Sequence, residues 1–198
     1  MGVILLVGIS FYVWHVHFNY RFEEISQNKV YKSALIAPDK LEGFLLKNNI
    51  KTVVDLLDPG VQDRLNPAKQ IQIDEEDRAV RAINKKHNLN IQHVNIASGQ
   101  VPTKATLTKF FEVLDKAENY PVLIHCYHGT GRAQMYSALY RIEYEKWSNK
   151  DARAKTRVIV EGLGYRSSFS DGKEKGDFLM NYQPRATGEN STMNKLEK

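Results

Sequence analysis

The sequence predicts an α/β fold: a central, mostly parallel β-sheet flanked by helices, preceded by an N-terminal transmembrane or signal-anchor helix. Three observations predict it. Short apolar runs rich in β-branched residues alternate with segments of helical periodicity, about 10 to 15 residues of helix separate successive runs, and residues 1–18 carry no charged side chain. Strands that are joined through helices in this way form parallel sheets.

The composition limits the possible classes of protein. A chain of 198 residues can form one domain and an appendage, and 42% apolar with 26% charged residues is ordinary globular usage. The single cysteine excludes an intrachain disulfide and a cysteine-rich metal site. The net charge of +5 fits an anionic partner. No basic run is longer than Lys85-Lys86, which argues against nucleic acid as that partner.

The first segment, residues 1–18, is predicted to be a membrane anchor. Its 17 residues after Met1 are uncharged, at the short end of what a bilayer requires, and Tyr12, Trp14 and Tyr20 are placed as an interfacial aromatic belt. A cleaved signal would need basic residues before the apolar run and small residues at the cleavage site. The first basic residue is Arg21 and the first alanine is Ala34, so we favour an uncleaved anchor over a removed signal or a buried element.

The charges that follow the anchor bear on its orientation. Arg21, Lys29 and Lys32 lie just after it and favour a cytoplasmic catalytic domain, although this rule is weak for a long following domain.

Residues 19–182 are predicted to form the folded domain, and residues 183–198 a disordered polar tail. Helix signals are apolar spacing of three or four residues with caps, and strand signals are short apolar runs. The expected strands are 52–57, 91–96 and 121–125. The expected helices are 38–47, a second that starts in the acidic run 74–77, a third capped by Thr103, and two more over 131–147 and 148–162.

The chemistry is expected in the loop between the strand that ends at His125 and the helix that starts near Gly131. The loop reads His125, Cys126, Tyr127, His128, Gly129, Thr130, Gly131, Arg132. A strand, a tight glycine-containing loop and a helix N-terminus aim several backbone N–H groups at one point, which binds a phosphate-sized anion. The same place favours a cysteine in its thiolate form. Cys126 is therefore a candidate nucleophile toward phosphorus.

Arg132 is the candidate partner of that anion. A guanidinium can grip two phosphate oxygens at once, which the ammonium of a lysine does not do. Residues 127–131 would supply the backbone amides around the phosphate.

These residues resemble the signature His-Cys-x-x-Gly-x-x-Arg of the cysteine-based phosphatases. Beyond the loop, residues 30–33, the helix 38–47, the strand 51–57 and Val101-Pro102-Thr103 are similar to the compact dual-specificity-type protein tyrosine phosphatases, over about residues 19–182. The resemblance implies that Cys126 forms a phosphocysteine, that Arg132 and residues 127–131 bind phosphate, and that His125 keeps the surroundings of the thiolate in shape. It implies no metal and no cofactor.

The most similar branch is the bacterial membrane-bound or periplasmic one, which often carries His-Gly in this loop. That resemblance implies a bacterial inner-membrane protein with a periplasmic catalytic domain, against the charge rule. The implied partners are a phosphotyrosine protein or a phospholipid headgroup. The absence of Lys and Arg from residues 127–131 favours the protein over a polyanionic headgroup.

The sequence departs from the family pattern at two places. Ala133 stands where the family has Ser or Thr, which predicts slow hydrolysis of the intermediate. The segment 97–102, where the family has an aspartate general acid, holds no carboxylate, and Ser98 is the nearest match. Losing a general acid costs about 10² to 10⁴ in rate.

Three other groups are possible proton donors. Asp55 and Asp58 stand at the carboxyl end of a predicted strand, where such sheets build their sites. Asp58, the candidate general acid, also fits a turn before Pro59. His128 could donate a proton or only add positive charge.

The leading interpretation is thus a membrane-anchored phosphomonoester phosphatase. The alternatives are a weakened phosphatase-like module that binds phosphorylated ligands with little turnover, and a lipid-phosphate phosphatase.

Overall fold

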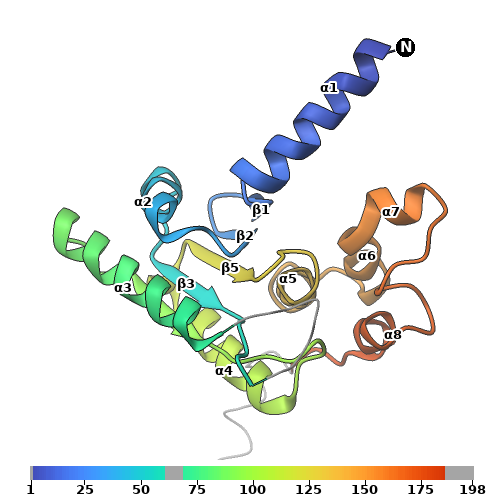
Figure 1. Ribbon diagram of the computed structural model, residues 1–198. Helices are drawn as coiled ribbons and strands as arrows, with labels where there is room; N and C mark the ends of the chain where they lie inside the picture. The colour runs from blue at the N-terminus through green and yellow to red at the C-terminus, as the bar shows by residue number, and fades with distance from the viewer. Residues whose placement is uncertain (1, 61–68, 186–198) are drawn as a thin grey trace, which may run out of the picture. The chain divides into compact units, whose positions relative to one another are not determined.

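The computed structural model describes residues 2–60 and 69–185 of the chain. It divides into two compact units, Met1–Ser137 and Ala138–Lys198. All the residues of the predicted site lie in the first unit, which also contains the sheet (Figure 1).

The first unit is built on a five-stranded sheet. The hairpin β1–β2 is antiparallel, whereas β2, β5, β3 and β4 run parallel to one another. This confirms the α/β class with a mostly parallel sheet. In spatial order, the strands are β1 (Glu23–Ser26), β2 (Val30–Ala34), β5 (Val122–Cys126), β3 (Thr52–Asp55) and β4 (Gln92–Asn95).

The two central strands, β3 and β5, are buried along their whole lengths. This is why their sequences are nearly continuous apolar runs rather than alternating ones. One face of the sheet is covered by α2 (Pro38–Lys47) and α3 (Gln70–His87). Leu41 and Leu45 of α2 form one core cluster with Val80 and Ile83 of α3 and with Val53 of β3.

Helix α4 (Lys104–Leu114) is capped as expected, because the Thr103 hydroxyl accepts a hydrogen bond from the Thr106 amide at 3.2 Å. Its Phe110 packs edge-on against Tyr136 of α5 (Arg132–Tyr144), with ring centroids 4.7 Å apart. A short 3₁₀ turn, Ala117–Asn119, precedes β5. These contacts pack α4 against the first turns of α5, directly after the loop of interest.

The second unit contains the rest of α5 and short helices. The single helix expected over 148–162 is wrong: α6 (Asn149–Ala154) is followed by a 3₁₀ turn (Lys155–Arg157) and by α7 (Val158–Gly162). A further helix, α8 (Glu174–Asn181), was not expected. Most of the tail predicted to be disordered, residues 186–198, lies outside the described residues.

The N-terminal segment is helical, as α1 (Gly2–Val13) and a π-helical turn (Trp14–Phe18). No helix among the described residues has the length and apolar character that a bilayer crossing requires. The membrane-spanning helix is therefore not confirmed. The segment still exposes large apolar side chains, between 50% and 68% of each for Leu6, Val7, Ile9, Phe11, Tyr12, Trp14 and Phe18.

Candidate active site

The cysteine loop lies where the sequence places it, between the end of β5 and the beginning of α5. Cys126 is the last residue of β5 and is buried, and Arg132 is the first residue of α5 and is also buried. The loop therefore leads into the N-terminus of α5, where unpaired backbone N–H groups and the helix dipole favour an anion. Of the loop residues, His128 is exposed, Gly129 is buried, and Tyr127, Thr130 and Gly131 are half-buried.

The loop rests on the carboxyl end of β2. The Leu35 amide donates to the Tyr127 carbonyl oxygen at 3.3 Å, and Gly129 has a φ of +69°. A β-carbon on Gly129 would lie 2.6 Å from the backbone nitrogen of Ala34. Only glycine allows this approach and this backbone conformation. The close approach of the loop to β2 therefore explains why the motif has glycine at position 129.

Arg21 supports the loop from the N-terminal side. Its Nη1 atom donates to the His128 carbonyl oxygen at 3.0 Å. The segment that holds Arg21 is itself fixed, because the Ala34 amide donates to the Tyr20 carbonyl at 2.7 Å and Phe22 packs on Tyr31. The sequence did not identify this contact, since it joins residues 107 positions apart.

The Arg132 side chain is hydrogen-bonded to backbone carbonyl groups that follow two strands. Its Nη1 atom donates to the Leu56 carbonyl at 2.5 Å and to the Ser98 carbonyl at 2.9 Å. Leu56 follows β3 and Ser98 follows β4, so the guanidinium is fixed at the carboxyl edge of the sheet, beside the loop that begins at Cys126. That arrangement can hold a phosphate dianion between the loop amides and a guanidinium.

Two of the possible proton donors are engaged within the fold. The Asp58 carboxylate accepts the Gly60 amide at 2.9 Å, which is the turn geometry that its position before Pro59 suggests. The buried Asp55 carboxylate accepts the Leu57 amide at 2.7 Å and the Asn95 side-chain amide at 3.0 Å. These hydrogen bonds show that both carboxylates stabilise local structure.

Ser98 and Ala133 mark the two departures from the family pattern. The Ser98 hydroxyl is buried and lies 2.8 Å from the Tyr136 hydroxyl, while its carbonyl holds Arg132. Ala133 is completely buried directly after Arg132. Neither residue supplies the group that the family pattern has at its position.

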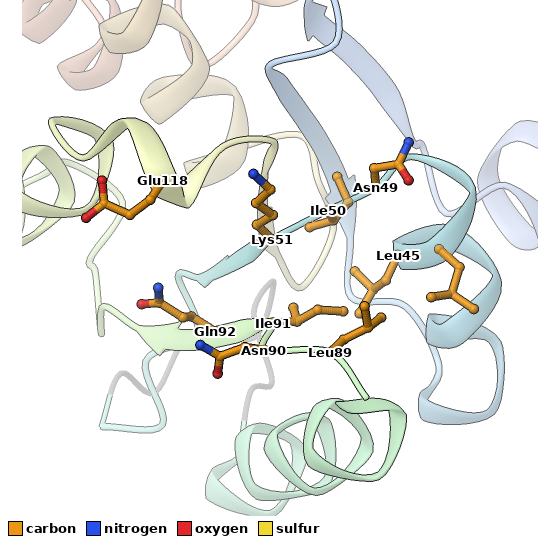
Figure 2. Close-up of a pocket in the computed structure, with 10 residues that line it drawn as sticks. Leu45, Asn49, Ile50, Lys51, Leu89, Asn90, Ile91, Gln92 and Glu118 are labelled. Atoms are coloured by element: carbon orange, nitrogen blue, oxygen red, sulfur yellow. The ribbon is translucent and has the colours of Figure 1, made fainter. Parts of the chain in front are cut away.

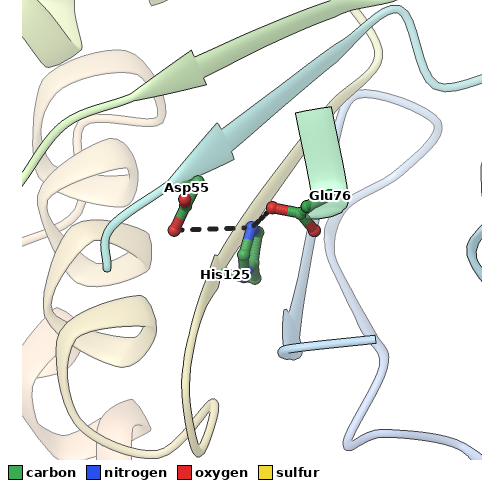
Figure 3. Close-up of side chains that lie close together, drawn as sticks. All are labelled: Asp55, Glu76 and His125. Carbon is green, nitrogen blue, oxygen red and sulfur yellow. Dashed lines mark ion pairs between the residues drawn. The ribbon is translucent and has the colours of Figure 1, made fainter. Parts of the chain in front are cut away.

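His125 belongs to a buried charged cluster on the face of the sheet that α3 covers. We call Asp55, Glu76, His93 and His125 the buried cluster. The His125 Nε2 atom lies 2.8 Å from a Glu76 carboxylate oxygen and 3.7 Å from Asp55 (Figure 3). The His93 Nε2 atom lies 3.0 Å from the same Glu76 oxygen. Glu76 is thus within ion-pair distance of both imidazoles.

The cluster shifts the pKa values of its members. Burial alone would lower the pKa of His125, but the charges of Glu76 and Asp55 raise it to about 9. Burial alone would raise the pKa of Glu76, but His125 and His93 lower it to about 2. The pKa of Asp55 is raised by burial and by Glu76, against the opposing effect of His125. At neutral pH, Glu76 and His125 are therefore a buried pair of opposite charges.

Sequence reasoning missed Glu76 and His93. Glu76 sits inside an acidic run that signals a helix start, but it shares a helix face with Ile73, Val80 and Ile83. A carboxylate on the apolar face of a helix is the signal that could have identified it, since such a group needs a buried partner.

The cluster has the residue types of a metal site. Ligand atoms of Asp55, Glu76 and His125 lie within 4.8 Å of one another. However, the nitrogen–oxygen separations of 2.8 and 3.0 Å are those of charged pairs, and Asp55 already accepts two hydrogen bonds. The residues fit an ion-pair cluster better than a metal.

A cavity of about 510 Å³ lies at the opposite end of the strands (Figure 2). Leu45 at the end of α2 and Ile91 before β4 form part of its apolar wall, and Lys51, Gln92 and Glu118 contribute polar groups. Since it lies at the amino ends of β3 and β4, it is separate from the loop at their carboxyl ends.

Comparison with known proteins agrees with this geometry. The family model described as "DSP-PTPase phosphatase fused to NAD+ Kinase" matches residues 18–169. No curated protein sequence matches the chain.

Several solved structures share the fold. The catalytic core of the PP-IP phosphatase SIW14 from S. cerevisiae is 16% identical, with 82% of this chain and 85% of that one covered and a TM-score of 0.56. TpbA from P. aeruginosa is 20% identical over 83% and 86% of the two chains, also with a TM-score of 0.56. PTPMT1 is 20% identical over 80% and 91%, with a TM-score of 0.51.

Proposed function

Since the chain belongs to the DSP-PTPase family and is a cysteine-dependent phosphatase, we propose that it hydrolyses phosphomonoesters through a phosphocysteine at Cys126. The observation that carries this proposal is the geometry of the loop: a buried cysteine ends β5, Gly129 brings the loop against β2, and Arg132 is fixed beside it at the start of α5.

The reaction has two steps. In the first, the Cys126 thiolate attacks phosphorus, an S–P bond forms, and the P–O bond to the leaving group breaks, with the oxygen keeping the electron pair and taking up a proton. In the second, water attacks phosphorus, the S–P bond breaks, and inorganic phosphate and the thiolate are released. Arg132 and the loop amides hold the three non-bridging oxygens and stabilise their charge in both transition states.

The residues around the loop favour a substrate with an acidic leaving group. The segment 97–102 contributes no carboxylate, and Asp58 is engaged by the Gly60 amide. A phenolic oxygen departs with little help from a general acid, because its ordinary pKa is about 10, far below that of an alkyl hydroxyl. This supports phosphotyrosine over phosphoserine or phosphothreonine.

The substrate that we favour is a phosphotyrosine protein. A TpbA variant was crystallised with pTyr, whereas PTPMT1 was crystallised with PI(5)P, so the fold accommodates both classes. Residues 127–131 contain no Lys or Arg to pair with the extra phosphates of a phosphoinositide. A lipid phosphate remains the second candidate, because Arg21 joins the loop to the segment that follows the exposed apolar helix.

Membrane attachment through residues 2–18 is part of the proposal. The apolar side chains exposed along α1 and the following turn need a partner of low polarity, and a bilayer interface supplies one. Flotation with phospholipid vesicles should retain the full chain and release a chain that begins at residue 19. Equal flotation of both chains would refute the attachment.

A periplasmic catalytic domain is proposed as well. Its support is the similarity of the cysteine loop to the membrane-bound or periplasmic branch, and the opposing charge rule from Arg21, Lys29 and Lys32 is weak for a long following domain. Protease added to intact spheroplasts should digest the domain. Complete protection until the membrane is lysed would place it in the cytoplasm.

The test of the proposed function is steady-state hydrolysis of an aryl phosphate by the full chain. Cys126→Ser should abolish turnover, and Arg132→Lys should lower kcat/KM by about 10² or more, because one ammonium cannot replace the forked guanidinium. Undiminished turnover by Cys126→Ser would end the proposal. A wild type that releases only one leaving group per cysteine would support the alternative of a phospholigand-binding module, which Ala133 and the missing loop aspartate favour.

A further inference from the structure

The buried cluster joins helix α3 to the residue that precedes the candidate nucleophile. Glu76, on the second turn of α3, is only 2% exposed, and its carboxylate lies 2.8 Å from His125 Nε2 on β5. Figure 3 shows the Glu76 side chain reaching from α3 to the imidazole, with Asp55 on its other side. Burying two charges is costly even when they pair, and this pair includes the residue that directly precedes Cys126 on β5.

The groups that face His125 come from three neighbouring elements. Asp55 of β3 lies 3.7 Å from Nε2, Glu76 of α3 lies 2.8 Å from it, and His93 of β4 shares the same Glu76 oxygen. A carboxylate oxygen of Asp77 on α3 lies 3.7 Å from the Nδ1 atom of His93. On β5 itself, the neighbouring Cys126 interacts with the His125 charge. Glu76 is therefore the nearest carboxylate to the imidazole in the described part of the chain.

This arrangement has a consequence for the sulfur. Cys126 directly follows His125 on β5, and a positive charge next to a cysteine favours its thiolate form. Burial without a counterion drives a histidine to its neutral form. The charge on His125 at working pH thus depends on a carboxylate supplied by another element of the fold.

We propose that Glu76 is a positioning residue of the phosphatase: it keeps His125 as an imidazolium beside Cys126 and thereby sets the pH at which the nucleophile becomes a thiolate. The inference rests on the proposed function, because it gives Cys126 a catalytic role. Glu76 touches neither substrate nor sulfur and acts only through His125.

The test compares Glu76→Gln with the matched control Glu75→Gln in the full chain. Glu75 is the adjacent residue of the same helix and is exposed, so its change removes the same charge from the surface. Three readouts are taken across pH 5 to 10 (roughly the range over which a shifted histidine titrates): histidine ring ¹⁵N shifts, the rate of alkylation by iodoacetamide, and kcat/KM for an aryl phosphate. Since the chain has one cysteine, alkylation reports on Cys126 alone.

In Glu76→Gln, His125 should be neutral at pH 7.5, where the wild type and Glu75→Gln hold an imidazolium. The alkylation and kcat/KM profiles should move to higher pH together, with both rates about tenfold lower at pH 6, as expected for a displacement of about one pH unit. The variant and wild-type profiles should converge above about pH 9, where the wild-type imidazolium is also lost.

Other outcomes overturn the proposal. A neutral His125 in the wild type at pH 7.5 does so without reference to any variant. A loss of kcat that is equal at every pH, with unchanged alkylation, would indicate a merely structural role for Glu76. If the wild type, after dialysis against a chelator, shows the same pH profile as Glu76→Gln, the cluster holds a metal instead.

A replacement variant and two readouts that are independent of turnover allow each outcome to be interpreted. If Glu76→Gln does not fold, Glu76→Asp is tested in its place. The shorter aspartate keeps the charge but holds it farther from His125, so both pH profiles should shift in the same direction by a smaller amount. If neither profile shifts, the proposal is overturned. The histidine ring ¹⁵N shifts and the rate of alkylation can both be measured without turnover. If Cys126→Ser still hydrolysed the aryl phosphate while these two readouts behaved as expected, the proposed function would fail separately from the Glu76–His125 coupling.

Discussion

Gly129 lies against the backbone of Ala34 so closely that a β-carbon at position 129 would be 2.6 Å from the Ala34 nitrogen. The same β-carbon would lie 2.8 Å from the carbonyl carbon of Ser33, and Gly129 adopts a φ of +69° that other residues rarely take. The end of β2 therefore fixes the position of the loop that follows Cys126.

Gly129→Ala should disrupt this approach. The loop has to move away from β2, so kcat/KM for an aryl phosphate should fall by about 10² or more, and the free energy of unfolding by about 1 to 3 kcal/mol from backbone strain. Gly43→Ala on α2 is the control, since nothing lies within 4 Å of its added carbon. An active, stable Gly129→Ala would show that the loop does not depend on this contact.

Ala133 offers a gain of function. A hydroxyl directly after Arg132 would stabilise the departing sulfur, so Ala133→Ser should speed hydrolysis of the phosphocysteine and raise kcat several-fold. Pre-steady-state kinetics should show a burst of leaving group in the wild type and a smaller burst in the variant. Because Ala133 is completely buried, thermal unfolding has to be checked. A folded Ala133→Ser with unchanged burst and kcat would contradict slow dephosphorylation.

The leaving group should control the rate. With no carboxylate in residues 97–102, kcat/KM should be higher for p-nitrophenyl phosphate than for a phosphotyrosine peptide. It should be about 10² to 10⁴ lower again for the matched phosphoserine peptide, which is the range that a general acid supplies. Equal rates for the two peptides would mean that another group protonates the leaving oxygen. A phosphoinositide assayed in parallel tests the lipid alternative.

Stability should depend on pH through the Glu76–His125 pair. The pKa of His125 is raised from 6.5 to about 9, so its stabilising contribution is complete below pH 6.5 and is lost as the pH rises through about 9. The pKa of Glu76 is lowered from 4.5 to about 2, so its contribution is complete above pH 4.5 and is lost as the pH falls through about 2.

Urea unfolding of the wild type and Glu76→Gln measures this effect. Their difference in unfolding free energy should be largest between pH 4.5 and 6.5, on the order of a few kcal/mol, and should shrink toward pH 9 and above. A difference that stays constant from pH 6 to pH 10 would mean that His125 does not exchange a proton in that range.

Much of the fold was predictable because its central elements follow simple patterns. Helix α2 begins at Pro38 and ends at Lys47 as expected, and the buried strands β3 and β5 are apolar runs. The expected strand 52–57 is shorter, since it ends at Asp55, where the side chain caps the following turn through the Leu57 amide. Helix α3 begins at Gln70 instead of in the acidic run, because its first turn uses a Lys69–Gln72 capping interaction.

The first two strands escaped prediction because of charge. In β2, Lys32 is buried and neutralised by Glu23 of β1, so the apolar pattern that reveals β3 and β5 is interrupted. The buried cluster was missed for a different reason: Asp55, Glu76, His93 and His125 come from four elements, and only the tertiary fold brings them together. The loop from Cys126 to Arg132 is local in sequence, which is why its residues could be recognised.

Covalent catalysis by Cys126 can be observed directly during turnover. The full chain is mixed with an isotopically labelled aryl phosphate, quenched within one turnover, digested and analysed by mass spectrometry. We expect one phosphoryl group on the peptide that contains Cys126, and none on the corresponding peptide of Cys126→Ser. Turnover by the wild type without any phosphoryl group on that cysteine would contradict covalent catalysis by Cys126.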